Sequence, residues 1–119
     1  MSKKPFVSKE KLDEIAAQYA TPFYLYDETA IRETALRVNK AFAWNQGFKE
    51  YFAVKATPNP AILKILHEEG CGADCSSYTE LQMADAVGFK GDEIMFSSNA
   101  TPAEDFQLAR QLNVTINLD

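Results

Sequence analysis

From residue 50 onwards, the chain alternates short apolar runs with longer stretches that have the spacing of an amphipathic helix. The expected strands are residues 50–55, 73–75, 93–96 and 114–118. Short strands that alternate with helices run parallel and are joined by right-handed crossovers. The spacing of about 20 residues between strand starts is typical of a (β/α) barrel, so the pattern predicts an α/β fold of this type.

Capping residues mark where the helices of this pattern begin. A Ser, Thr, Asp or Asn just before an apolar-periodic stretch accepts a hydrogen bond from a free backbone N–H, and a Glu three residues later completes a capping box. The expected caps are Ser8, Asp27, Asn59 (with Pro60 at the first helical position), Ser77 (with Glu80) and Thr101 (with Pro102 at the first helical position and Glu104). These caps predict five helices, two of them before residue 50.

The number of strands limits the domain organisation. A closed barrel needs eight strands and about 250 residues, whereas this chain has 119 residues and four expected barrel strands. A parallel sheet that stopped after the strand at 114–118 would leave an open edge. We therefore expect residues 28–119 to be the N-terminal half of a barrel. Residues 1–27, with a helix at 8–20 and an aromatic strand at 23–26, break the barrel spacing and are assigned to a second domain.

Composition excludes several classes of function. Apolar residues make up 46% and charged residues 24% of the chain, which is typical of a globular domain, and the net charge is -5. This charge argues against binding to nucleic acid or an anionic membrane. No apolar stretch follows the first residues, so the expected location is the cytoplasm. His67, Cys71 and Cys75 are too few for a metal site, and none is expected.

Lys55 is the strongest candidate for a catalytic residue. It ends the expected strand at 50–55, and the carboxyl end of a strand is where a (β/α) fold places catalytic groups. Partial burial at such a position favours the nucleophilic free amine that a Schiff-base lysine needs. Strand alternation puts Lys55 on the same face as Ala53, and opposite Phe52 and Val54. If Phe52 and Val54 pack on helices, a small residue leaves room for a ligand beneath the amine.

Three segments in this order resemble a known family. They are residues 21–27 (Thr-Pro-Phe-Tyr-Leu-Tyr-Asp), 51–56 (Tyr-Phe-Ala-Val-Lys-Ala) and 72–81 (Gly-Ala-Asp-Cys-Ser-Ser-Tyr-Thr-Glu-Leu). Together they are similar to the fold-type III decarboxylases of basic amino acids, which depend on pyridoxal 5′-phosphate (PLP). Within that family the pattern is most similar to the diaminopimelate decarboxylases. The resemblance extends from about residue 8 to residue 119.

The resemblance implies an alanine-racemase-like PLP-binding barrel and a separate β domain, built mostly from the C-terminal half, with which residues 1–27 would associate. It implies that Lys55 bonds covalently to PLP, that Ala53 lines the floor beside the ring, and that Asp74 and Glu80 face the cofactor. The implied reaction of the full-length protein, a homodimer in this family, is the decarboxylation of meso-2,6-diaminopimelate to L-lysine and CO2. The remaining cofactor contacts would lie beyond residue 119, so the chain alone is expected to be inactive.

Several alternatives remain open. Asp74 could satisfy loop amides after its strand, and Glu80 could serve only as the acid of a capping box. Thr57 stands where the family usually has asparagine, which leaves the substrate open to another basic amino acid or to a carboxynorspermidine-type compound. A half-barrel that binds PLP without catalysis is the non-enzymatic alternative. With open sheet edges, the isolated chain is also expected to self-associate.

Overall fold

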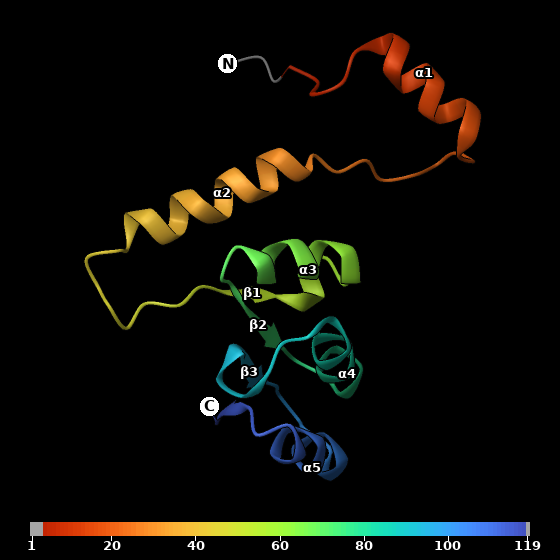
Figure 1. Cartoon of the computed structure of the whole chain (residues 1–119). Helices are drawn as coiled ribbons and strands as arrows, with labels where there is room; N and C mark the ends of the chain where they lie inside the picture. The colour runs from red at the N-terminus through yellow and green to blue at the C-terminus, as the bar shows by residue number, and fades with distance from the viewer. Residues whose placement is uncertain (1–3, 119) are drawn as a thin grey trace.

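The computed structural model describes residues 4–118 and contains four strands, five α-helices and two short 3₁₀ helices (Figure 1). Met1–Lys3, in the basic start of the chain, and Asp119 lie outside the described residues. The elements in chain order are α1 (Lys9–Gln18), α2 (Glu28–Ala41), β1 (Tyr51–Ala53), η1 (Val54–Ala56), α3 (Pro60–Glu68), β2 (Gly72–Cys75), α4 (Tyr78–Val87), η2 (Gly91–Glu93), β3 (Ile94–Ser97), α5 (Ala103–Gln111) and β4 (Thr115–Asn117). No helix between residues 4 and 118 has both the length and the hydropathy needed to cross a bilayer.

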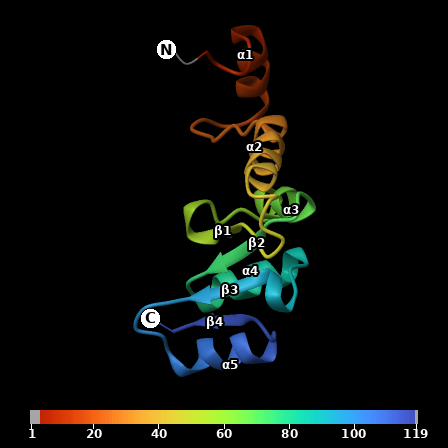
Figure 2. The same cartoon turned by 90° about the vertical axis from the view of Figure 1, so that its left-hand side faces the viewer.

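The strands form one parallel sheet in the order β1-β2-β3-β4, as the alternating pattern predicts (Figure 2). Each strand pairs with the next one along the chain, and a helix connects them on one side of the sheet. The register places Ala53 beside Asp74, Asp74 beside Met95, and Met95 beside Thr115. The four strands therefore present aligned rows of side chains across the sheet.

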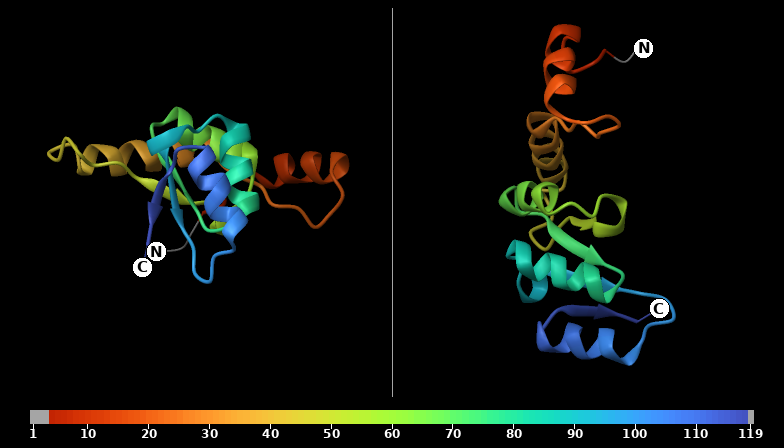
Figure 3. Two further views of the ribbon diagram at one scale, coloured as in Figure 1. Left: turned by 90° about the horizontal axis from the view of Figure 1, so that it is seen from below. Right: turned by 90° about the vertical axis from the view of Figure 1, so that its right-hand side faces the viewer.

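The core lies between the sheet and the helices that follow each strand. Alternate residues of the strands are buried against α3, α4 and α5 in a single cluster, which includes Val54, Ala73, Cys75, Ile94 and Phe96. The residues between them point to the opposite side, which no helix of the described chain covers (Figure 3). We call this side the uncovered face; it carries Tyr51, Ala53, Gly72, Asp74, Met95, Ser97, Thr115 and Asn117.

The helices before the sheet differ in how they are attached. Helix α2 lies across α3, where Ala35 is buried with Ile62, Leu66 and Cys71. The guanidinium of Arg32 joins the two helices, because it forms ion pairs with Glu28, Glu68 and Glu69. Helix α1 buries none of its residues and lies away from the sheet (Figure 1).

Three local expectations are wrong. The segment expected as a strand at 23–26 belongs to no strand of the described chain and pairs with none of the four strands of the sheet. The first barrel strand ends at Ala53, so Lys55 lies in η1 rather than in a strand. Thr101 does not cap α5: its hydroxyl donates to the carbonyl of Ser98, and Pro102 takes the N-cap position.

The other caps form as expected. Ser8, Asp27, Asn59 and Ser77 each accept a hydrogen bond from a backbone N–H in the first turn of their helices. Asn59 also places Pro60 at the first position of α3, directly after the turn that carries Lys55. The local sequence thus sets the distance between the end of β1 and the start of α3.

Candidate active site at the carboxyl edge of the sheet

The carboxyl ends of the four parallel strands bring several polar side chains to one edge of the uncovered face. Lys55 follows β1 in η1, Asp74 lies near the end of β2, and Ser97 and Asn117 end β3 and β4. Lys55 is exposed, whereas the sequence predicted partial burial. The difference arises because no described segment covers this face beside η1. The amine is therefore accessible to a ligand approaching the uncovered face.

Asp74 has a carboxylate oxygen whose hydrogen-bonding capacity is not satisfied. Its Oδ1 atom is buried and has no hydrogen-bond partner among the described residues. Burial raises the pKa of the Asp74 carboxyl above its usual range, while the nearby positive charge of Lys55 lowers it and the charge of Glu80 raises it. The structure thus brings Lys55, Asp74 and Glu80 close enough for their charges to interact. A buried acceptor without a donor is costly and is commonly found where a ligand completes the site.

Glu80 belongs to α4 but folds back onto the loop that follows β2. Its Oε2 accepts hydrogen bonds from the backbone N–H of Ser76 at 2.7 Å and from the Ser76 hydroxyl at 3.1 Å. The expected capping box is therefore only half correct. The Ser77 hydroxyl accepts from the Glu80 N–H, but the Glu80 carboxylate binds Ser76 instead of the Ser77 N–H. Glu80 holds the loop next to Asp74 in place.

The uncovered face has a small side chain below the lysine and a large one further down. Ala53 lies next to Asp74 in the register. One row lower, the Tyr51 ring lies over Gly72, and the Tyr51 hydroxyl donates to the backbone carbonyl of Asp92. Space is thus left beside Ala53, and Tyr51 closes the amino-terminal end of the face.

These features fit a cofactor that bonds covalently to a lysine. The accessible amine supplies the attachment point, and Asp74 supplies a buried oxygen that lacks a donor. Ala53 leaves room for a planar ring beside them. The positions of Lys55, Ala53, Asp74 and Glu80 agree with a shared site, and their roles toward a cofactor remain predictions.

Two polar residues of this edge, Ser97 and Asn117, were not predicted from the sequence as site residues. The Nδ2 atom of Asn117 donates a hydrogen bond to the Ser97 hydroxyl at 2.8 Å. The expected third strand ended at residue 96 and the fourth ran on to 118, so neither residue was recognised as a strand end. A search for polar residues at both carboxyl ends would have found the pair, given the register.

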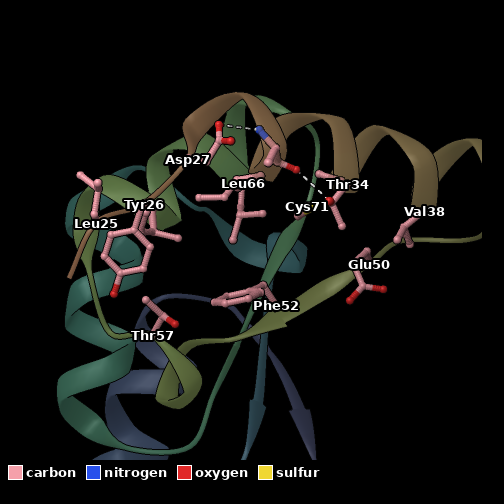
Figure 4. A pocket seen from close by; sticks show the side chains of 14 residues that line it. Leu25, Tyr26, Asp27, Thr34, Val38, Glu50, Phe52, Thr57, Leu66 and Cys71 are labelled. Carbon is pink, nitrogen blue, oxygen red and sulfur yellow. Dashed lines mark hydrogen bonds between the residues drawn. The ribbon is translucent and has the colours of Figure 1, made fainter. Parts of the chain in front are cut away.

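An apolar groove of about 510 Å³ lies at a different place, between α2 and the free edge of β1 (Figure 4). Its lining includes Ile31, Val38, Phe52, Leu66 and Cys71. Neither Lys55 nor Asp74 lines it, so the groove is separate from the candidate site. It lies along the outer edge of β1, which pairs with β2 on its other side.

A parallel strand–helix sheet with an accessible lysine and a half-buried aspartate at its carboxyl edge has the architecture of part of a (β/α) barrel with a ligand site at the usual end. Comparison with known proteins makes this assignment specific. Residues 28–119 match the model of the pyridoxal-dependent decarboxylase family, in its pyridoxal-binding domain. The chain belongs to this family. Its fold is the first half of a PLP-binding (β/α) barrel, and pyridoxal phosphate is the cofactor of this domain.

Individual relatives agree with the family assignment. Protein TabA of Pseudomonas amygdali pv. tabaci is 48% identical over 91% of this chain and 26% of that protein. The diaminopimelate decarboxylase of Methanothermobacter thermautotrophicus is 38% identical over 89% of this chain and 25% of that enzyme. The crystal structure of a diaminopimelate decarboxylase from M. jannaschii in complex with L-lysine superposes with a TM-score of 0.81, at 32% identity, over 89% of this chain and 26% of that one. The chain thus spans about a quarter of the length of these relatives.

Proposed function

We propose that the full-length protein containing this chain is a PLP-dependent amino-acid decarboxylase and that Lys55 is the covalent attachment point of the cofactor. The observation that carries the proposal is the placement of an accessible Lys55 near Asp74, whose buried Oδ1 has no hydrogen-bond partner among residues 4–118. When bound, the cofactor supplies an electron sink: the bond from the α-carbon to the carboxylate breaks, CO2 leaves, and a proton replaces it on that carbon.

The residues of this chain have distinct roles in the proposal. Lys55 would hold the cofactor covalently through its amine and would give up this place to the amine of the substrate. Asp74 would accept a hydrogen bond from the Lys55 amine through its partnerless Oδ1 and so keep the amine in position. Glu80 acts through Ser76, because it holds the loop beside Asp74. Ala53 leaves space for the ring.

The proposed substrate is meso-2,6-diaminopimelate and the proposed product is L-lysine. Several relatives with this activity in their names support the choice, since they are 38–40% identical to this chain. TabA, at 48% identity, carries no reaction in its name, so another basic amino acid or a carboxynorspermidine-type substrate is the competing choice. The proposal includes a cytoplasmic homodimer in which residues 1–27 associate with a C-terminal β domain.

Borohydride reduction tests the cofactor role directly. The full-length protein is incubated with PLP, reduced and digested, and the labelled peptide is identified by mass spectrometry. We expect the label on Lys55 and its loss in Lys55→Ala. Lys64→Ala, which removes an exposed lysine of α3, is the matched control and should keep the label. Labelling elsewhere in the wild-type protein would contradict the proposal.

Release of CO2 from diaminopimelate, lysine and ornithine then ranks the substrates. The isolated 119-residue chain should label weakly and without preference for Lys55, and should release no CO2. Selective labelling of Lys55 in the isolated chain, without CO2 release by the full-length protein, would favour a PLP-binding domain that does not catalyse.

A further inference from the structure

Ser97 and Asn117 form a polar pair on the same face and edge of the sheet as Lys55. They are partners in the β3–β4 register, and the Asn117 Nδ2 donates to the Ser97 Oγ at 2.8 Å. Ser97 is half-buried and Asn117 is exposed. Neither residue contributes to the cluster that packs the sheet against the helices. The pair therefore has no packing role in the described chain.

The direction of this hydrogen bond determines what Ser97 can offer. A serine hydroxyl carries one proton and can accept through its lone pairs. Because the Ser97 oxygen already accepts a hydrogen bond from Asn117, the hydroxyl proton is free to be donated to another acceptor. Within residues 4–118, no acceptor receives it. The pair thus presents a free O–H donor to the uncovered face.

The register puts this donor at the carboxyl edge of the sheet, where η1 carries Lys55. Ala53, Asp74 and Met95 form one row across the sheet. Lys55 follows Ala53 by two residues in η1, and Ser97 follows Met95 by two residues at the end of β3, so both lie beyond that row toward the carboxyl edge. Strands are about 4.8 Å apart, which puts β3 about 10 Å and β4 about 14 Å from β1. Of the two residues, Ser97 on β3 is therefore the one nearer to β1 and Lys55.

We propose that the Ser97 hydroxyl donates a hydrogen bond to an anionic oxygen of the molecule held at Lys55, and that Asn117 is a positioning residue which orients this hydroxyl. The inference rests on the proposed function of Lys55. Two sources could supply the oxygen: the ring oxygen of the cofactor or the carboxylate of the substrate. The chemistry of recognition is the same for both, and binding measurements separate them.

The test compares Ser97→Ala with Asn117→Asp in the full-length protein. An aspartate cannot donate to Ser97 and instead accepts its proton, so Asn117→Asp should reproduce the loss in Ser97→Ala although the hydroxyl is still present. Both variants lose a hydrogen bond to a charged oxygen. We therefore expect the dissociation constant of the molecule that carries this oxygen to rise roughly tenfold. The double variant should lose no more than either single one. Ser97→Thr should restore binding, and Thr115→Val, which removes a hydroxyl one row below on β4, is the matched control.

The two possible sources of the oxygen, the cofactor ring and the substrate carboxylate, predict different results in the binding measurements. If the oxygen belongs to the cofactor, the variants bind PLP more weakly, and the pH dependence of the absorption band of the lysine-bound cofactor shifts without substrate. If it belongs to the substrate, PLP binding is unchanged, L-lysine binds more weakly, and cadaverine, which lacks a carboxylate, binds as before. Wild-type behaviour of either Ser97→Ala or Asn117→Asp in both assays overturns the inference. The proposed function fails separately, if borohydride does not trap PLP on wild-type Lys55.

Discussion

Replacing Gly72 by alanine should destabilise the fold, although the backbone at Gly72 requires no glycine conformation. A methyl group at this position would lie 2.6 Å from Cδ1 of Tyr51 and 2.7 Å from the backbone oxygen of Glu93. The Tyr51 ring could move only by giving up the hydrogen bond from its hydroxyl to Asp92. The Glu93 oxygen belongs to the backbone at the end of η2, directly before β3, and cannot move without shifting the start of that strand.

The magnitude follows from these two contacts. Overpacking a well-filled site costs about 1–3 kcal/mol, and a lost hydrogen bond costs about 1 kcal/mol more. We expect Gly72→Ala to lower the free energy of unfolding by about 3 kcal/mol. With a urea dependence of about 1–3 kcal/mol per molar, the midpoint should fall by at least about 1 M. Far-UV circular dichroism of the full-length protein in urea measures this shift.

Two further variants isolate the cause. Gly47→Ala is the matched control, because its methyl group would meet only the Asn45 side chain at an ordinary 3.6 Å, and its effect should stay within about 0.5 kcal/mol. Tyr51→Ala combined with Gly72→Ala removes the clash with the ring but not the clash with Glu93. Adding Gly72→Ala to Tyr51→Ala should therefore lower the free energy of unfolding by less than Gly72→Ala does in the wild-type protein. If Gly72→Ala has the stability of the wild type, the close approach deduced from the structure is wrong.

Four other outcomes are expected. Arg32→Ala should lower the melting temperature, and the loss should shrink in high salt, because the ion pairs that join α2 to α3 are partly exposed. Cys75, whose pKa is raised to about 12 mainly by burial, should resist iodoacetamide at neutral pH and react only in denaturant, as mass spectrometry would reveal. The raised pKa of Asp74 means that the folded state binds more protons, so stability falls as pH rises through that pKa. Asp74→Asn should accordingly be more stable than wild type at neutral pH but not in acid, a difference that urea titrations at both pH values would detect, while it impairs PLP binding. The isolated chain should self-associate through its free strand edges and apolar groove, and a monodisperse monomer in light scattering would contradict this.

Local patterns in the sequence were sufficient to predict most of the elements. Period-two and period-3.6 spacing predicted four strands and five helices, and the Asn59-Pro60 cap located the start of α3 directly after the lysine. The end of β1 was missed because pairing with the neighbouring strand, rather than local composition, decides where a strand stops. Thr101 was missed because its hydroxyl found the Ser98 carbonyl, an alternative that competes with capping.

The site was predictable only in part for a related reason. Lys55 and Asp74 could be placed near each other because both follow the carboxyl end of an expected strand. The partnerless Oδ1 of Asp74 depends on burial by the surrounding chain, which no local pattern encodes. The Ser97–Asn117 bond joins residues 20 positions apart and depends on the β3–β4 register.

The one-sided packing of the sheet has a consequence for the order of events during synthesis. The residues that bury Val54, Leu63, Leu81 and Phe96 all lie between Phe52 and Ile116. Because these contacts are local in the sequence, this layer can begin to assemble as soon as residues 52–116 have been synthesised. No element of this layer covers the uncovered face, at whose carboxyl edge Lys55 lies. The scaffold can thus be in place before the surroundings of its reactive amine are complete.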